Sequence, residues 1–415
     1  MKIKQQGIDP LEFFLKLRDE QNVCFLNSTG PEGWGARLAF DPVDRYCYKA
    51  GSNKNAIRSF VKKNIAKGRL MVGFFSYDLG YELHQISKTA IDDLQLPDIC
   101  FYAFDNHLLF KNNIAEIHYE DNGFLQRMDD IIARPLPQPP QVKSVNFRPI
   151  WSPQSYERAY HTIKDHIVRG DIYQINLTHR LEARSSLPAK FIFKKVMEKN
   201  PVDFLAYIEG DGYEVLSASP ERFVKITKRK IETCPIKGTR PRGRTAVSDQ
   251  RYLDELLANE KEAAELNMIT DLLRNDLGKV CRPGSVKVRG SRLVSKCPTV
   301  WHTYSCINGM VADQYEPIDA LVSMLPGGSI TGCPKKRAME IIDALEPTTR
   351  SVYTGAIGVI EPGGNLDFSI AIRTIIKKAE RLYLQVGGGI VHDSTEKAEF
   401  QETLDKAKSF MRILS

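Results

Sequence analysis

The sequence lacks long hydrophobic runs and a signal peptide. No stretch approaches the roughly 18 consecutive apolar residues that a membrane-spanning helix needs, and the first residues, MKIKQQGIDPLEFF, lack the apolar segment of a secretory signal. Cysteine is sparse as well, because the 8 cysteines contain no C-x-x-C pair and are too few for a disulfide scaffold. We therefore expect a protein without membrane contact, with reduced cysteines and a cytoplasmic location.

Several common site motifs are also missing. The segment GGSITGCPKK (327–336) lacks the Lys and Ser/Thr that complete a phosphate-binding loop. No G-x-S-x-G elbow occurs, and Cys333 is followed by Pro334, which has no N–H to donate to an oxyanion hole. The 8 histidines show no zinc-ligand spacing. Phosphate-loop, serine-hydrolase, cysteine-amidase and zinc chemistry are therefore not expected.

What remains is the composition of a large globular protein. Its 415 residues are 42% hydrophobic, 26% charged and 9% aromatic, which is enough for an extensive core. The formal net charge of +7 comes from 58 Lys plus Arg against 51 Asp plus Glu, spread along most of the chain. The one dense basic cluster, residues 237–244, is predicted to be a loop. A small anion is as good a candidate ligand for it as nucleic acid.

Proline density divides the chain. Residues 132–150 contain prolines at positions 135, 137, 139, 140 and 149, which argue against a helix or central strand and predict an extended linker. We expect residues 1–131 to form an N-terminal part and residues 151–415 to form the main region. Strand-like runs in the main region follow one another without regular intervening helices. This pattern predicts an α+β fold with antiparallel sheets.

Hydrophobic periodicity places the main elements of that region. A Ser-Pro start and apolar spacing predict a helix after Ser152, and alternation over residues 172–183 predicts a half-buried strand. Residues 251–278 are predicted to form one long amphipathic helix that ends at Gly278. Strand-like runs follow at 353–362, 368–379 and 381–391, before a last helix.

Two acidic pairs lie on the predicted helices. Glu262 and Glu265 are three residues apart in one helix, hence on one face, and Glu399 and Glu402 repeat this spacing in the last helix. Carboxylate oxygens are the ligands that Mg²⁺ prefers. On spacing alone, however, a charged and solvated helix face explains both pairs better.

A series of short motifs gives these pairs a context. The motifs are SPERF (219–223), PIKGTRPRG (235–243), AELNMITDLLRNDLG (264–278), GGSITGCPK (327–335), YTGAIG (353–358), IAIRT (370–374), VGGGIV (386–391) and AEFQET (398–403). In this order they resemble the chorismate-utilising enzymes, over residues from about 150 to 410. The resemblance implies two large antiparallel sheets packed together with helices outside. The main region would bind chorismate, and the weakly matched N-terminal part would complete the fold.

The resemblance also implies roles for individual residues. Glu265 and Glu402 would bind Mg²⁺ directly, and Glu262 and Glu399 would act on it through water. Glu221 in SPERF matches the general acid that protonates the departing hydroxyl, and His302 matches a histidine near the substrate ring. By itself, Glu221 in a turn or His302 in an apolar strand would more simply be structural.

Further positions match the substrate-binding surface of the family. Tyr353 and Arg373 would hold the enolpyruvyl carboxylate, for which the planar guanidinium of Arg is suited. A buried ion pair is the alternative for Arg373. The remaining positions that the resemblance assigns to substrate are Gln174, Gly238, Thr239, Ser329, Ala356, Gly387 and Gly389.

Two positions discriminate among family members. Members that add water carry a Lys base where this chain has Gln174, which has no titratable group. Anthranilate synthases typically read PIAGT, whereas this chain reads PIKGT with Lys237. That lysine resembles aminodeoxychorismate synthase component I, in which the Lys amine displaces the ring hydroxyl and ammonia then displaces the Lys. A Lys237 that only binds an anion or orients ammonia is the alternative.

The resemblance therefore implies amination of chorismate to 4-amino-4-deoxychorismate, the precursor of 4-aminobenzoate and folate. Ammonia would come from a glutamine amidotransferase subunit, component II. Anthranilate synthase component I is the alternative, although Asp203 in NPVDF (200–204) departs from the tryptophan-binding motif and feedback by tryptophan is not expected. A non-enzymatic anion or nucleic-acid binder using residues 237–244 is a further alternative. That loop has no aromatic residue to stack on bases, so no nucleic-acid partner is expected.

Overall fold

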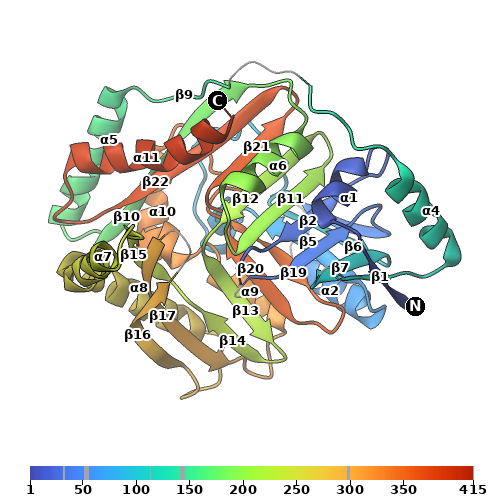
Figure 1. The fold of residues 1–415 in the computed structure, drawn as a ribbon. Helices are drawn as coiled ribbons and strands as arrows, with labels where there is room; N and C mark the ends of the chain where they lie inside the picture. Colours follow the sequence, from blue (N-terminus) through green and yellow to red (C-terminus); the bar gives the residue numbers. More distant parts are fainter. Residues whose placement is uncertain (31–32, 51–55, 113, 141–144, 297–299, 415) are drawn as a thin grey trace.

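Apolar strands, several buried on both faces, form two antiparallel sheets at the centre of this computed structural model, and helices cover the outer faces (Figure 1). The structure describes residues 1–30, 33–50, 56–112, 114–140, 145–296 and 300–414. Residues 141–144 of the predicted linker lie outside the described residues. The predicted α+β fold with two packed antiparallel sheets is confirmed.

Sheet A joins strands from both ends of the chain. In spatial order its strands are β1 (Lys2–Gln6), β8 (Ile114–His118), β7 (His107–Lys111), β3 (Ala36–Ala39), β2 (Cys24–Asn27), β11 (Phe204–Gly210), β12 (Tyr213–Ser219), β21 (Thr374–Lys378), β22 (Arg381–Ile390), β10 (Gln174–Arg184) and β18 (Gly332–Cys333). The short β9 (Arg148–Pro149) pairs with β10. Residues 1–131 therefore supply the first five strands of this order.

Sheet B is built in the same interleaved way. Its spatial order is β15 (Ile236–Pro241), β17 (Val300–Met310), β14 (Lys230–Thr233), β13 (Arg222–Thr227), β20 (Leu366–Ile370), β19 (Ala356–Ile360), β5 (Leu70–Phe75), β6 (Ile99–Phe104) and β4 (Asp44–Tyr48). A further strand, β16 (Lys287–Lys296), pairs with β17. The N-terminal β5 pairs directly with the C-terminal β19.

Helices pack on the apolar outer faces of both sheets. They are α1 (Pro10–Lys16), α2 (Ala56–Ala66), α3 (Leu79–Leu83), α4 (Asn122–Ala133), α5 (Pro153–Val168), α6 (Ala189–Lys199), α7 (Ala246–Ala258), α8 (Glu260–Gly278), α9 (Pro317–Met324), α10 (Lys335–Leu345) and α11 (Glu396–Leu414), with a 3₁₀ turn, η1, at Gly328–Ile330. Helices α1, α4, α6 and α11 cover sheet A, and α2, α8 and α9 cover sheet B. In the described part, none of these helices combines the length and apolarity that crossing a bilayer requires.

Two predicted elements differ from the structure in ways that bear on the site. Residues 251–278 form the two helices α7 and α8 rather than one, because Asn259 is extended (φ −75°, ψ 103°) and its side chain accepts the Glu262 N–H. Asn259 thus caps α8. The basic cluster 237–244 is not wholly a loop, since its first five residues belong to β15.

The strand predictions need two further corrections. The run 368–379 is two strands, because Arg373 has φ +52° and the chain passes there from β20 in sheet B to β21 in sheet A. The strand predicted at 172–183 is β10, and it is buried on both faces rather than half-buried. By contrast, α5 begins as predicted, with the Ser152 hydroxyl accepting the Ser155 N–H.

A buried arginine ties these layers together. Arg350 is 1% exposed and donates to both oxygens of Glu346, at 2.9 and 2.7 Å. The same guanidinium donates to the carbonyls of Ile330 (3.0 Å) and Asn176 (2.6 Å), and it lies over the Tyr77 ring. Glu346 in turn accepts from the backbone N–H and hydroxyl of Thr178 on β10. One ion pair therefore links α10, η1, β10 and the N-terminal third.

Replacing Arg350 by Ala should destabilise the protein by about 3–5 kcal/mol, because Glu346 is left as an unpaired buried charge. The free energy of unfolding from urea titration is the measurement. Arg337→Ala is the matched control, since Arg337 on α10 pairs at 3.0 Å with Glu340 but both side chains are largely exposed. It should cost about 0–1 kcal/mol. Equal losses in the two variants would contradict the prediction.

Candidate functional site

A β-bulge on β15 sets the directions of its side chains. β15 pairs Lys237 with Thr303 but Thr239 with His302, so Gly238 is the extra residue. Gly238 has φ +81°, and a Cβ there would lie 3.0 Å from the Thr303 hydroxyl. Only glycine adopts this conformation in this space without strain. Because His302 and Thr303 are consecutive on β17, the bulge places Lys237 and Thr239 opposite residues that lie on different faces of sheet B.

Lys237 lies between two carboxyl groups. Burial raises the pKa of both Glu221 and Glu265, and the Lys237 ammonium offsets part of that rise in each. Glu221 is 8% exposed and accepts a hydrogen bond from the Ser329 hydroxyl at 3.1 Å. The Thr303 hydroxyl donates to the carbonyl of Lys237 and so holds its backbone. Sequence reasoning missed Thr303, because no motif signal marks it.

The two acidic pairs face one another across α8 and α11. Burial is the main cause that raises the pKa of Glu265 and of Glu399, and repulsion from Glu402 adds to both shifts. Glu262 accepts from Arg240 at 2.9 Å through one oxygen, while its other oxygen is buried without a partner. The structure thus brings together four carboxylates that the sequence presents as two separate pairs.

These carboxylates form an open set of oxygen donors. In the described part of the chain, no three of the four have oxygen atoms that all lie within 4.8 Å of one another. Two lysines that the sequence analysis did not single out accompany them, with Lys261 Nζ 3.9 Å from Glu399 and Lys406 Nζ 2.7 Å from Glu402. The all-oxygen donor set and the unpartnered Glu262 oxygen fit a hard divalent cation.

The three consecutive glycines of β22, at positions 387 to 389, have different neighbours in this region. A Cβ at Gly388 would lie 3.4 Å from a Glu399 oxygen, whereas one at Gly389 would lie 2.7 Å from the Gln174 amide nitrogen. Gly387 accepts from Lys406 through its carbonyl at 2.8 Å. The glycine that faces the acidic pairs is therefore Gly388, which the sequence analysis did not select. Gln174 is 1% exposed, and its amide oxygen has no hydrogen-bond partner.

Arg373 opens onto a cavity of about 450 Å³ next to α11. The lining residues are Arg373, Ala398, Gln401, Glu402, Asp405 and Lys406. Burial lowers the pKa of Arg373, and no carboxylate in the described residues forms an ion pair with it, which argues against the buried ion pair considered above. His302 donates to or accepts from the Thr239 hydroxyl at 2.8 Å. Burial and then the nearby Arg373 lower the pKa of His302, which favours the neutral form of the imidazole.

Tyr353 and Ala356 occupy the segment next to Arg373. The Thr354 N–H donates to the Ala371 carbonyl at 2.8 Å, and Ala356 pairs with Ile370. Tyr353 is 6% exposed, and in the described part no hydrogen bond or ring contact joins its side chain to Arg373. The two segments are adjacent, but the structure does not join the two side chains.

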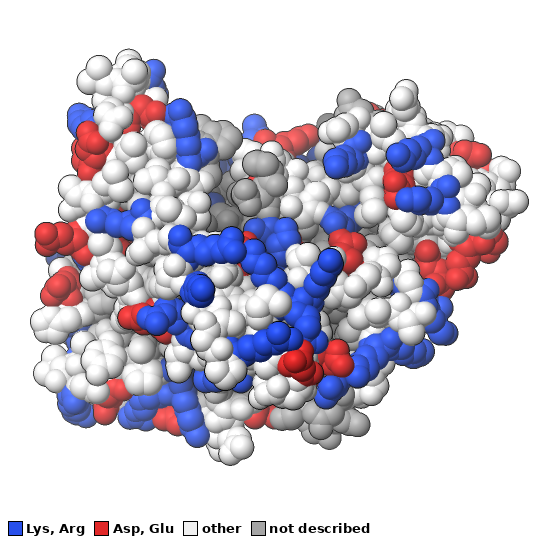
Figure 2. All heavy atoms as spheres, turned by 90° about the horizontal axis from the view of Figure 1, so that it is seen from below, with Lys and Arg blue, Asp and Glu red and all other residues white. Residues whose placement is uncertain are grey.

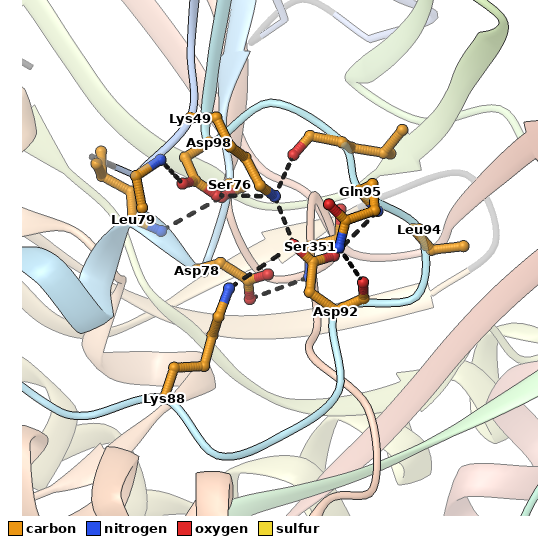
Figure 3. A network of polar contacts seen from close by, with 12 residues as sticks. Lys49, Ser76, Asp78, Leu79, Lys88, Asp92, Leu94, Gln95, Asp98 and Ser351 are labelled. Carbon is orange, nitrogen blue, oxygen red and sulfur yellow. Dashed lines mark hydrogen bonds and ion pairs between the residues drawn. The ribbon is translucent and has the colours of Figure 1, made fainter. Parts of the chain in front are cut away.

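A polar network from the N-terminal third supports this segment (Figure 3). Asp78 accepts the Ser351 N–H at 3.1 Å, and burial raises the pKa of Asp78 to about 6. In the same network Lys49 pairs with Asp92 at 2.6 Å, and Ser76 donates to Asp98 at 3.3 Å. Residues 76–98 thus fix the turn that precedes Tyr353.

Two of the three arginines in the basic cluster, Arg240 and Arg242, have partners within the chain. Arg240 pairs with Glu262, and Arg242 pairs with Asp249 at 2.6 Å while its guanidinium lies 4.5 Å from the Trp301 ring centre. Both guanidinium groups are therefore occupied by partners within the chain. Less of the cluster is free to bind an external polyanion than the sequence suggested.

Comparisons with known proteins show which family the chain is similar to. The family model described as "chorismate binding enzyme" matches residues 5–412. The chain is 37% identical over 358 residues to aminodeoxychorismate synthase component 1 of Bacillus subtilis, covering 83% of this chain and 76% of the relative. It is 34% identical over 443 residues to an anthranilate synthase component 1 of Haloarcula marismortui, covering 98% and 90%.

Among solved structures, anthranilate synthase component I from Streptococcus pneumoniae TIGR4 superposes with a TM-score of 0.83 at 28% identity, covering 98% of both chains. The family match spans nearly the whole chain, including the N-terminal part that carried few motifs. The resemblance first seen in short motifs is therefore confirmed. This chain belongs to the chorismate-binding enzyme family, whose substrate is chorismate.

Proposed function

We propose that the chain aminates chorismate to 4-amino-4-deoxychorismate, for 4-aminobenzoate and folate synthesis. The observation that carries the proposal is the place of Lys237, which lies on β15 beside the Gly238 bulge and close enough to Glu221 and Glu265 to offset part of the rise that burial causes in the pKa of both carboxyls. A lysine between a buried acid and an acidic cluster can act as a nucleophile beside a proton donor. Relatives named aminodeoxychorismate synthase and anthranilate synthase are similarly identical to the chain, so the proposal of one reaction over the other rests on Lys237.

The proposed chemistry has two displacements. The neutral Lys237 amine attacks the ring and displaces the hydroxyl, while Glu221 donates a proton so that the hydroxyl leaves as water. Ammonia then forms a bond to the ring carbon that the hydroxyl left, and the C–N bond to Lys237 breaks to return the free amine. The buried Glu221 suits this role, because a raised pKa keeps its carboxyl protonated at higher pH.

We also propose that the two acidic pairs hold Mg²⁺, with Glu265 and Glu402 as direct ligands and Glu262 and Glu399 acting through water. A bound Mg²⁺ would neutralise the ring carboxylate of the substrate and polarise the ring. The support is physical: four crowded carboxylates, two of them with raised pKa values, gain from a divalent cation between them.

The remaining site residues are proposed to position chorismate. Arg373, with no carboxylate partner found in the described residues, is available to the enolpyruvyl carboxylate beside Tyr353. The neutral His302 lies near the substrate ring, oriented by Thr239. Main-chain and side-chain contacts are proposed for Gln174, Gly238, Ser329, Ala356, Gly387 and Gly389, with Gly388 added from the structure.

Ammonia is proposed to come from a separate glutamine amidotransferase subunit. The relatives are named as first components of two-component enzymes, which supports a second component here. None of the cysteines has the sequence context of an amidotransferase nucleophile, and Cys333 is followed by Pro334 in a cis peptide bond. The isolated chain is therefore expected to use ammonium but not glutamine.

The test of Lys237 combines product analysis with an adduct search. Wild-type protein with chorismate, Mg²⁺ and ammonium should form 4-amino-4-deoxychorismate, and without ammonium it should accumulate a covalent adduct at Lys237. Lys237→Ala should form no adduct and lose most activity. Lys237→Arg should also fail, because a guanidinium keeps the charge but offers no neutral amine.

Mass spectrometry of the intact protein and of the products decides between the alternatives. Lys225→Ala is the control, because Lys225 lies on β13, which β17 and β14 separate from β15, and it pairs with Asp367 at 3.9 Å. A fully active Lys237→Arg variant without an adduct would remove the covalent step. Anthranilate as the main product would overturn the proposed reaction itself.

The Mg²⁺ proposal predicts opposite effects on stability with and without metal. In EDTA, Glu265→Gln should raise the melting temperature, because it relieves like-charge crowding with Glu262 and Glu402. With Mg²⁺ at about one hundred times its Kd, wild type should gain about 2.7 kcal/mol, and the variant should gain much less. Glu255→Gln, at an exposed Arg251 pair on α7, is the control. A variant that Mg²⁺ stabilises as much as wild type would contradict the proposed ligand.

The proposed acid Glu221 predicts a specific pH effect. Since burial raises its pKa, activity should fall as the pH rises through that raised value and the carboxyl loses its proton. The Ser329 hydrogen bond favours the charged form, so Ser329→Ala should move the descending limb of kcat/KM to higher pH. Ser185→Ala, a buried serine remote from the site, should leave the limb in place. A shift to lower pH would contradict the role of Glu221.

A further inference from the structure

A pair of thiols lies outside the proposed active site, at the junction of β14, β15 and β17. Cys234 follows β14, Cys306 lies on β17, and their sulfur atoms are 2.9 Å apart. The neighbouring Ser305 N–H donates to the Pro235 carbonyl at 3.2 Å. Residues 234 and 306 therefore form the adjacent non-hydrogen-bonded pair of this antiparallel ladder, in which opposite side chains approach most closely.

A carboxylate completes the cluster. Glu232 lies two residues before Cys234, hence on the same face of the strand. One carboxylate oxygen of Glu232 and both sulfur atoms all lie within 4.8 Å of one another, and it is the sole group of three potential metal ligands this close in the described residues. Neither a hydrogen bond nor an ion pair to the Glu232 carboxylate is found in the same part of the chain.

A buried amide faces the same cluster without a partner. Asn308 is directly opposite Glu232 in the ladder and two residues from Cys306, so it shares their face of the sheet. It is 6% exposed, and its side-chain nitrogen has no hydrogen-bond partner. Rotation of the amide by half a turn would present its carbonyl oxygen as a further donor.

The chemistry of these three ligand atoms favours one class of cation. Two sulfur atoms and a carboxylate oxygen suit a thiophilic divalent ion such as Zn²⁺, whereas Mg²⁺ requires hard oxygen ligands. Tetrahedral Zn–S bonds of about 2.3 Å hold two sulfurs about 3.8 Å apart, so the thiols need to separate by less than about 1 Å. All three side chains are half-exposed, so a solvent ion reaches them and water can occupy an open position.

Two basic side chains, Arg289 and Lys230, lie near this cluster. Both cations are exposed on the strands that lie at the bottom of Figure 1. The view from below shows Lys and Arg side chains gathered across that face (Figure 2).

We propose that Glu232, Cys234 and Cys306 form a second metal site, which binds a thiophilic divalent cation and is separate from the carboxylate site. The site lies on the strands that carry the proposed chemistry, since β17 also holds His302 and Thr303. Because Thr303 holds the Lys237 carbonyl, a cation that ties β14 to β17 would stiffen the backbone beneath Lys237.

The chain contains a natural control for this site. Cys47 and Cys100 also face each other across neighbouring strands, β4 and β6, with sulfur atoms 3.2 Å apart. Within the described residues, no third ligand atom lies within 4.8 Å of both. The two thiol pairs therefore differ in the presence of the carboxylate.

The test is a Co²⁺ titration of the reduced full-length chain in excess Mg²⁺, without oxygen. Wild type should bind one Co²⁺ with the charge-transfer absorption of cobalt–thiolate bonds, and Zn²⁺ should displace it. Cys306→Ala should abolish the band, and Glu232→Gln should weaken binding by about tenfold or more. Cys47→Ala should bind Co²⁺ as wild type does.

A second measurement needs no variant. Zn²⁺ should slow alkylation of Cys234 and Cys306 in the wild-type protein without slowing that of Cys47, as read by peptide mass spectrometry. A titration without a thiolate band, or a band that survives in Cys306→Ala, would overturn the proposal. It would also fail if Glu232→Gln bound Co²⁺ as tightly as wild type, or if Zn²⁺ left the alkylation of Cys234 and Cys306 unchanged.

Discussion

The buried ion pair between Arg350 and Glu346 is the constraint on which the arrangement of the site depends. Its guanidinium fills the space between β10, η1 and the turn before Tyr353, and it satisfies carbonyls from two of these segments. η1 carries Ser329, and β10 begins at Gln174, so residues from distant motifs take their positions from one charged group. An apolar side chain could fill the volume, but it could not satisfy these carbonyls.

Near this ion pair, the proposed active site brings together carboxylates that would repel one another without nearby cations. Carboxylates from α8 and α11 face each other, and lysines 237, 261 and 406 lie among them. Burial of Glu221, Glu265 and Glu399 strengthens every one of these interactions because it removes water from between the charges. The fold thus holds acidic and basic side chains close together, as the proposed reaction requires.

Much of this could be predicted from sequence, because the motif residues carry their signal locally. The antiparallel α+β fold and the grouping of Glu221, Ser329 and Lys237 agree with the motif order. The crossing of the chain at Arg373 could not be predicted, since strand-like apolar residues flank it on both sides and only the backbone angle separates the two strands. Gly388 was missed for a related reason, because three consecutive glycines give no indication of which one faces the acidic helices.

The interleaving of early and late strands has a consequence for biosynthesis. β5 is made early, but one of its edges pairs with β19, and β2 likewise pairs with β11. On the ribosome these edges stay open until the distant partner strands emerge, and such non-local pairing folds slowly. A nascent chain interrupted before residue 356 would present the apolar, unpaired edge of β5 to other chains. The fold therefore depends on completed synthesis, and chaperone capture of the growing polypeptide is its natural safeguard.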